Sequence, residues 1–313
     1  MRCAITALTA AAILSIAPCA AAGVVYSTGF DDYLNGNLSG QSAWVGPTGS
    51  WATSGSMNSG QIACTVLASD GGVLPVGGTG KMVRITTERF LSSGRSKGWL
   101  DFLNSGKWAT ASAGGNTVLR TTVSMYIPAG NLLGSSFGVI VYRDAATAAG
   151  GFLVNAQTGQ VSLANGGYDL ASRTATATSV ALGQWNTFTL DWNSATGEAT
   201  LSVNGSTAGS FTSVATGSVY SAQLFSTTDA PGAGTTPLNA YAYFDNFSAE
   251  GVAPAPACPA DVTGDGVVDG ADLGRLLGTW GRATIATPTD LNHDGIVDGA
   301  DLGIMLGAWG PCV

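Results

Sequence analysis

Two short stretches near the C-terminus repeat one spacing of oxygen-bearing side chains. The first, residues 261–272, reads Asp-Val-Thr-Gly-Asp-Gly-Val-Val-Asp-Gly-Ala-Asp, and the second, residues 290–301, reads Asp-Leu-Asn-His-Asp-Gly-Ile-Val-Asp-Gly-Ala-Asp. In both, oxygen side chains occupy positions 1, 3, 5, 9 and 12, and glycine occupies position 6. A hard cation such as Ca²⁺ takes about six to eight oxygen ligands, which a loop that turns sharply at glycine can supply. The spacing therefore predicts two calcium sites.

The predicted ligands are side-chain oxygens and one main-chain carbonyl in each loop. The first site comprises Asp261, Thr263, Asp265, the carbonyl of Val267, Asp269 and Asp272; the second comprises Asp290, Asn292, Asp294, the carbonyl of Ile296, Asp298 and Asp301. The alternative is a pair of solvated turns, because Asp, Asn and Gly are common turn residues. Eight carboxylates in so short a span would repel one another without a cation, and this favours calcium.

An apolar stripe at helical spacing follows each loop. The stripes are Leu273, Leu276, Leu277 and Trp280, and then Leu302, Met305, Leu306 and Trp309. Residues 261–281 and 290–310 are identical at fourteen of 21 positions, so we interpret them as an internal repeat of one loop and one helix.

This order of loop, helix, connector, loop and helix over residues 258–313 resembles a dockerin type I module, which carries the calcium loop and following helix of an EF-hand without the leading helix. The resemblance implies two bound Ca²⁺ ions and a docking partner, either a cohesin-like or a cell-surface protein. Loop positions 10 and 11 are Gly270-Ala271 and Gly299-Ala300. Cellulosomal dockerins commonly carry a polar pair there that contacts cohesin, so the resemblance supports calcium binding more than it supports the cohesin contact.

The N-terminus has the pattern of an export signal, with Arg2, an apolar run over residues 4–17 and small residues up to Ala22. We therefore expect residues 1–22 to be a signal peptide and the mature chain to be secreted to the extracellular space or the cell surface. Cys258 and Cys312 bracket the repeat, and in an exported chain this placement predicts a disulfide between them. Cys64 is left over, and we expect it to be a small buried hydrophobic residue.

Residues 23–251 alternate short β-prone runs with turns rich in Gly, Asn and Ser. Examples of the runs are residues 81–86, 117–127, 137–142, 187–192 and 199–203. Many short strands with regular turn signals predict a mainly β, antiparallel sandwich or barrel. Residues 252–257, Val-Ala-Pro-Ala-Pro-Ala, predict a short stiff linker to the module at 258–313.

Several phrases in this region resemble concanavalin A-like, laminin G-like jelly rolls. They are residues 184–192 with the following strand that ends in Val-Asn-Gly at 203–205, the opening residues 30–33 and 40–44, and the closing residues 240–248. The resemblance implies an antiparallel β-sandwich (jelly roll) whose first and last strands lie together. Asp31 or Asp32 would then meet Asp245 at a third calcium site, although ordinary turn and edge aspartates remain the alternative.

Catalytic patterns are weak in the predicted sandwich. His293 is the only histidine and lies inside a calcium loop, which excludes a histidine-dependent triad or lyase base in residues 23–251. A pair of carboxylates could assemble from Asp101, Asp144, Asp169 and Asp191, but the sequence gives no reason to choose among them. Sugar binding needs only aromatic faces and a few hydrogen-bonding groups. The candidates are Trp99, Trp108, Tyr142, Arg143 and Tyr168, while we expect Trp185 and Trp192 to lie in the core.

Charge and hydropathy exclude two partner classes. The formal net charge is −8 at pH 7, and no basic cluster indicates nucleic acid. Beyond the signal, no apolar stretch reaches the length of a membrane span. The sequence thus predicts a secreted, non-catalytic carbohydrate-binding or adhesion protein with a calcium-binding docking module. The alternative is a polysaccharide-degrading glycoside hydrolase or lyase that carries the same module.

Overall fold

The computed structural model describes most of the chain, with gaps. It describes residues 23–41, 51–55, 63–88, 95–130, 135–166, 172–228, 239–254, 258–263, 267–281, 288–292 and 294–311. The predicted signal peptide, residues 255–257 of the predicted linker, Asp265, His293 and Cys312 lie outside these residues.

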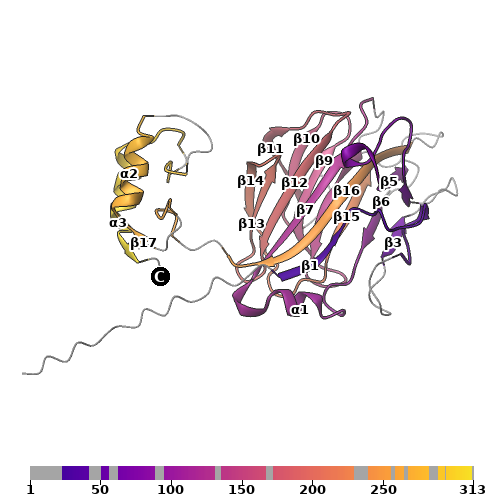
Figure 1. The fold of residues 1–313 in the computed structure, drawn as a ribbon, viewed down its shortest axis with the longest axis horizontal. Coiled ribbons are helices and arrows are strands. Elements are labelled where there is room, and N and C mark those ends of the chain that lie inside the picture. Colours follow the sequence, from indigo (N-terminus) through magenta and orange to yellow (C-terminus); the bar gives the residue numbers. More distant parts are fainter. Residues whose placement is uncertain are drawn as a thin grey trace, which may run out of the picture.

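Two antiparallel sheets form a β-sandwich (Figure 1). The nine-stranded sheet has the order β14-β13-β12-β7-β16-β5-β4-β2, with β1 also paired to β16, and the seven-stranded sheet has the order β11-β10-β9-β8-β15-β6-β3. The nine strands are β1 (Gly23–Thr28), β2 (Gly36–Asn37), β4 (Cys64–Leu67), β5 (Met82–Glu88), β7 (Val118–Tyr126), β12 (Trp185–Asn193), β13 (Glu198–Val203), β14 (Ser206–Thr212) and β16 (Asn239–Val252). The seven are β3 (Ala52–Gly55), β6 (Arg95–Trp99), β8 (Ser135–Tyr142), β9 (Ala148–Asn155), β10 (Gln160–Ala164), β11 (Arg173–Ser179) and β15 (Ser221–Thr228). The predicted mainly β sandwich is confirmed.

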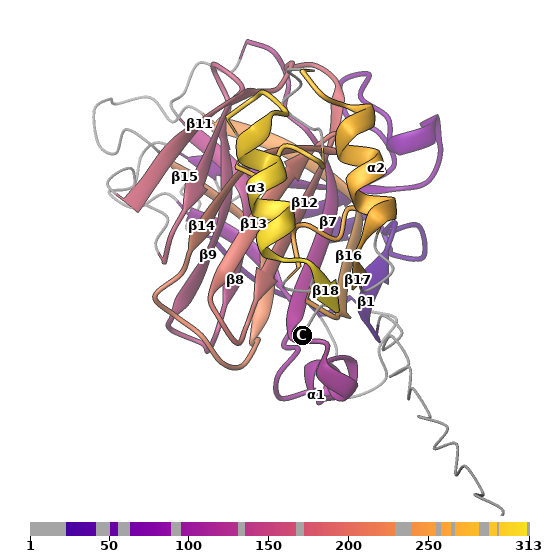
Figure 2. The same ribbon diagram turned by 90° about the vertical axis from the view of Figure 1, so that its left-hand side faces the viewer.

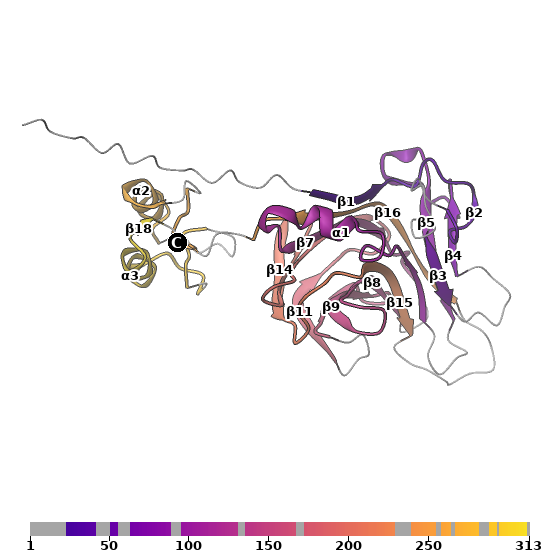
Figure 3. The same cartoon turned by 90° about the horizontal axis from the view of Figure 1, so that it is seen from below.

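The core lies between the two layers, which Figure 3 shows with β7, β14 and β16 above β8, β9 and β15. Alternate residues of each strand point into it, as expected for strands with one buried face. Phe152 of β9 stacks on Phe188 of β12, with ring centroids 4.8 Å apart. Trp192 is buried as predicted, but Trp185 is only partly buried. The expectation for Trp185 was wrong because β12 points its even-numbered residues 188, 190 and 192 into the core.

The first and last strands of the sandwich pair with each other. Strand β1 runs antiparallel to β16 from the pair Gly23–Gly251 to the pair Thr28–Phe247. This arrangement confirms what the jelly-roll resemblance implied for the two ends of the domain. Short helical elements connect other strands: η1 (Val76–Gly78), α1 (Lys107–Ala111) and η2 (Ala113–Gly115), of which α1 packs against β1 and β16.

The C-terminal part contains the two expected helices, α2 (Gly270–Gly278) and α3 (Gly299–Gly307), which lie side by side in Figure 2. Strands β17 (Val267–Val268) and β18 (Gly310–Pro311) pair beside them. A small apolar cluster holds these elements together: Ala260, Val268, Leu276, Val297 and Met305. Within the described residues, no helix has both the length and the hydrophobicity that a bilayer span requires.

Candidate functional site

The outward side of the seven-stranded sheet is the candidate functional surface, and we call it the outer face. Side chains along each strand alternate between the two faces of the sheet, so the residues between the core positions point to the outer face. An apolar cluster separate from the core lies on this side, and its members are buried, at 0–8% exposure: Ile140, Tyr142, Ala148, Leu153, Ala164 and Phe225. Polar and charged residues share this side: Arg95, Lys97, Trp99, Ser136, Asn155, Arg173, Ser221, Gln223 and Thr227.

Lys97 lies at the centre of an aromatic group on this face. Its Nζ is 4.9 Å from the ring centroid of Trp99 and 5.3 Å from the ring centroid of Tyr142. Lys97 and Trp99 belong to β6 and Tyr142 to β8, with β15 between the two strands. Both distances lie within the range of a cation–π interaction, so the two rings hold the ammonium in place.

The ammonium of Lys97 is partly desolvated. Burial lowers the pKa of Lys97 below its ordinary value, and repulsion from Arg95 on the same strand lowers the pKa further. Residues two apart on a strand share one face, which is why these two cations face the same side. The sequence Arg-Ser-Lys-Gly-Trp at 95–99 carries this alternation, but we did not single out Lys97 from the sequence.

Gln223 supplies an unsatisfied hydrogen-bond acceptor on the strand between these groups. The residue is 1% exposed, and its Nε2 donates to Ser221 Oγ at 3.0 Å. Its Oε1 is buried and has no hydrogen-bond partner among the described residues. Such an orphaned acceptor costs about 1–3 kcal/mol, so it calls for a functional or structural reason. A ligand hydroxyl could satisfy it.

Arg173 extends across the face from the edge strand β11. Its Nη1 donates to Ser136 Oγ on β8 at 2.8 Å, so the side chain crosses β10 and β9. The guanidinium adds a second fixed cationic group to the outer face.

Of the five sugar-binding candidates, the structure brings Trp99 and Tyr142 together. Trp108 of α1 is 6% exposed and packs in the core of the sandwich, so the structure does not bring it to the outer face. The reason is that α1 turns this ring inward against the sandwich. Tyr168 lies outside the described residues.

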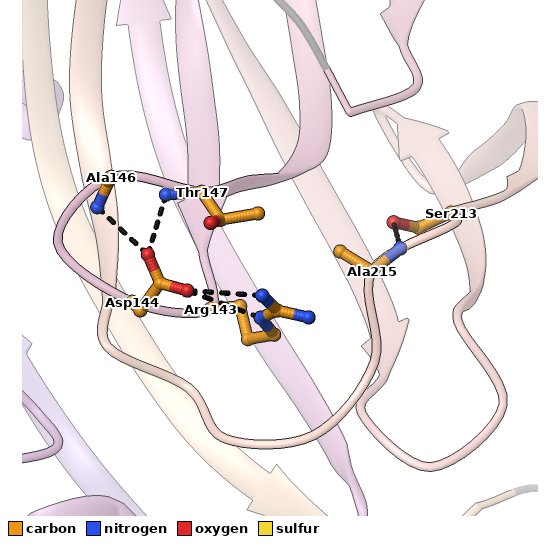
Figure 4. A network of polar contacts seen from close by, with 6 residues as sticks. All are labelled: Arg143, Asp144, Ala146, Thr147, Ser213 and Ala215. Carbon is orange, nitrogen blue, oxygen red and sulfur yellow. Dashed lines mark hydrogen bonds and ion pairs between the residues drawn. The ribbon is translucent and has the colours of Figure 1, made fainter.

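Arg143 is held within the turn between β8 and β9 (Figure 4). Its Nε and Nη2 donate to Asp144 Oδ2 at 3.3 and 3.2 Å. Asp144 Oδ1 accepts from the backbone N–H groups of Ala146 and Thr147, and these bonds, chiefly that from Ala146, lower the pKa of Asp144 to about 2. The geometry therefore gives Arg143 a turn-stabilising ion pair.

The four candidate catalytic aspartates do not assemble into a pair among the described residues. Asp101 accepts from the backbone N–H and Nδ2 of Asn104, and Asp144 is in the turn just described. Asp191 lies on the nine-stranded sheet, where Arg120 donates to both of its oxygens at 2.8 and 2.7 Å. Asp169 lies outside the described residues. A shallow pocket of about 400 Å³ beside Asp191 is lined by this ion pair and Glu198.

Asp31 and Asp245 approach each other beside Gly29. A methyl group at Gly29 would lie 3.6 Å from Asp31 Oδ2 and 3.9 Å from Asp245 Oδ1, and 3.5 Å from Asn246 Oδ1. Asp245 is 3% exposed, and burial raises its pKa to about 6, with repulsion from Asp31 as a smaller cause. The predicted encounter is therefore present. Three oxygens around one point fit the donor chemistry of Ca²⁺, and a calcium ion there remains a prediction.

The last aspartate of each predicted calcium loop is fully buried and caps the following helix. Asp272 accepts from the backbone N–H of Thr263 at 2.9 Å and of Asp269 at 2.8 Å. Asp301 accepts from Leu291 and Asp298 in the same way, at 2.6 and 2.9 Å. Both helices therefore begin with a capping box.

The second loop shows how its remaining oxygens are placed. Asp290 accepts from the backbone N–H of Asp294 at 3.2 Å and of Gly295 at 3.0 Å, and Asp294 accepts from Ile296 at 2.9 Å. These oxygens match the donor set of a calcium site. In the described part of the chain, however, no three His, Cys, Asp or Glu side chains converge as a metal-binding group. Calcium binding by both loops stays a prediction.

The cysteines differ in state. Cys64 is a free thiol that is fully buried, and burial raises its pKa to about 12. Cys258 is disulfide-bonded. Its predicted partner, Cys312, lies outside the described residues, so the pairing of these two cysteines stays a prediction.

Comparisons with known proteins give no family. No protein-family model and no curated protein matches the chain. Among solved structures, an endo-1,3-β-glucanase from Streptomyces sioyaensis aligns with 16% identity and a TM-score of 0.45 over 76% of this chain and 99% of that chain. An endo-β-1,4-glucuronan lyase from Trichoderma reesei aligns with 13% identity and a TM-score of 0.41, over 74% and 97%. The carbohydrate esterase vb_24B_21 from bacteriophage phi24B aligns with 15% identity and a TM-score of 0.42, over 74% and 100%. At these TM-scores, the similarities carry no argument about the activity of this chain.

Proposed function

We propose that this chain is a secreted carbohydrate-binding or adhesion protein that binds a glycan on the outer face of its seven-stranded sheet. The observation that carries the proposal is the unpaired, buried acceptor of Gln223 beside the group of Lys97, Trp99 and Tyr142. A glycan supplies hydroxyl donors for such an acceptor.

The C-terminal part would attach the protein to a partner, a cohesin-like or cell-surface protein, with two Ca²⁺ ions holding its loops. Four large apolar side chains of the repeat support a docking role because they are about half exposed: Leu277, Trp280, Leu306 and Trp309. Only Leu276 and Met305 of the predicted stripes are fully buried. Clustered exposed apolar residues are typical of interaction surfaces.

The test is retention of the full chain in gels that contain soluble polysaccharides. Replacing Trp99 by Ala should weaken retention at least tenfold, because Lys97 loses one of its two aromatic supports. Tyr241→Ala is the matched control, since Tyr241 lies under Arg84 in a similar cation–aromatic pair on the opposite sheet, at 5.9 Å. Unchanged retention of the Trp99 variant, or loss in the control alone, would remove the proposal.

The alternative is a polysaccharide-degrading enzyme, and one observation favours a lyase over a hydrolase. Glycoside hydrolases commonly use two carboxylates, and the described strands of the seven-stranded sheet contain no Asp or Glu. A lyase needs a general base instead, and Lys97, with its lowered pKa, lies beside Tyr142. Release of unsaturated products would establish the lyase; retention without product release favours binding alone.

A further inference from the structure

The seven-stranded sheet is positively charged in a protein that is acidic overall. Its strands contain three basic residues, Arg95, Lys97 and Arg173, and no acidic residue, while the whole chain has a formal net charge of −8. All three basic side chains stand at outward positions. The outward side of the nine-stranded sheet differs, because it carries charges of both signs: Arg84 and Arg120 together with Asp191, Glu198 and Glu250.

The aromatic rings on the outer face position a cation. Nζ of Lys97 lies over the ring of Trp99 and over the ring of Tyr142, so the ammonium occupies one face of each ring. A sugar cannot stack on those same ring faces while Lys97 is there. The arrangement therefore favours recognition through the charge of Lys97 over recognition through aromatic stacking.

The charge of Lys97 lacks compensation from the protein. Burial and the neighbouring Arg95 both disfavour its charged form, and no carboxylate contributes to its environment in the described structure. A like charge on the same face of one strand raises the electrostatic potential there. An anionic group bound at this point would relieve that repulsion, and partial burial would strengthen the ion pair relative to one in water.

A second group beside Lys97, the side-chain oxygen of Gln223, lacks a hydrogen-bond donor. Gln223 precedes Leu224, which pairs with Gly98, so Gln223 lies across from Trp99 on the neighbouring strand. Its Oε1 is buried and unpaired among the described residues. An anion alone would not satisfy this acceptor, but a ligand that carries both acidic groups and hydroxyl groups would satisfy Gln223 and Lys97 together.

We propose that the ligand of the outer face is an acidic polysaccharide, whose carboxylate or sulfate groups bind Lys97 and whose hydroxyl groups donate to Gln223 Oε1. Arg95 and Arg173 lie on the same face of the sheet as Lys97. This inference rests on the proposed glycan-binding function and names its ligand class.

The experiment uses the full chain and three soluble polymers with one backbone: a neutral β-glucan, its C6-carboxylated form and its sulfate ester. We expect at least one acidic form to be retained at least tenfold more strongly than the neutral form. Added salt should weaken that retention, because screening reduces the attraction. The carboxylated and sulfated arms identify which acidic group is bound. Net repulsion between an acidic protein and an acidic polymer makes such retention a sign of a specific site.

Variants at Lys97 test whether this residue binds the acidic group of the polymer. Lys97→Met should weaken acidic-polymer retention roughly tenfold to a hundredfold, the range for loss of one charged hydrogen bond. Lys97→Arg should keep most of it. Lys107→Met removes the same charge from the exposed side of α1 and should change retention less than twofold. If Lys97→Met fails to fold, Lys97→Gln and the salt dependence of the unmodified protein decide the question.

The outcomes separate the two proposals. Equal retention of neutral and acidic polymers, lost in Trp99→Ala but unchanged in Lys97→Met, overturns the acidic-ligand inference and leaves glycan binding intact. Retention of none of the polymers, together with no binding to a wider panel of neutral glycans, overturns both. Equal losses in Lys97→Met and Lys107→Met would show a bulk charge effect and also overturn the inference.

Discussion

Replacing Gln223 by Met should stabilise the protein while weakening its binding of a glycan. Gln223 is buried, and only its Nε2 has a partner, Ser221 Oγ at 3.0 Å. Removing an unsatisfied buried acceptor gains about 1–3 kcal/mol, and losing one neutral hydrogen bond costs about 0.5–1.5 kcal/mol. Methionine has a similar volume and an unbranched chain, so it adds little packing strain. The expected net change is about +1 kcal/mol in the free energy of unfolding.

Gln160 offers a matched control of opposite sign. Its Nε2 donates to three backbone carbonyls, those of Val161, Thr176 and Thr178, at 3.0, 2.8 and 3.0 Å. Gln160→Met would leave these carbonyls without that donor, so it should lower the free energy of unfolding by about 1–3 kcal/mol.

Urea unfolding, followed by the fluorescence of the buried Trp51 and Trp192, measures both variants. At an m-value of about 2 kcal/mol per molar, 1 kcal/mol shifts the midpoint by about 0.5 M. A loss of stability in Gln223→Met comparable with that in Gln160→Met would refute the reasoning. It would mean that Oε1 of Gln223 is satisfied in solution and that the residue serves the fold.

Three further predictions concern other parts of the chain. Calcium at 100 times its dissociation constant should stabilise the C-terminal part by about 2.7 kcal/mol, measured by calorimetry. Asp301→Asn should reduce this stabilisation, whereas the control Asp101→Asn should keep it. Equal stabilisation of both variants would contradict the assignment of Asp301 as a calcium ligand. The pKa of Asp144 is lowered to about 2, so its carboxylate stabilises the turn fully at pH values above the ordinary pKa of 3.8 and loses this effect as the pH falls through 2. A carbon-detected NMR titration of Asp144 should therefore have a midpoint well below 3.8. Cys64, with its pKa raised to about 12, should resist thiol reagents at pH 8 until the protein unfolds, and rapid labelling of the native state would show an open site.

Much of the architecture follows from local pattern. Alternating strands with turn signals predicted the antiparallel sandwich, and the repeated stripes after each aspartate loop predicted α2 and α3. The position of Trp185 was wrong because a core assignment needs the register of a whole strand, and β12 turns that residue outward. Two of the four residues in each helical stripe are exposed, because two short helices packed on their loops bury only Leu276 and Met305 fully.

The sequence by itself determined the loop spacing, its oxygen donors and the alternation of each strand, because these depend on residues close together in the chain. Only the tertiary structure decided which side chains meet on the outer face. Lys97, Tyr142 and Gln223 come from three strands, and their encounter depends on β15 lying between β6 and β8 in one register. That order is set by packing between distant segments, so no local spacing encodes it.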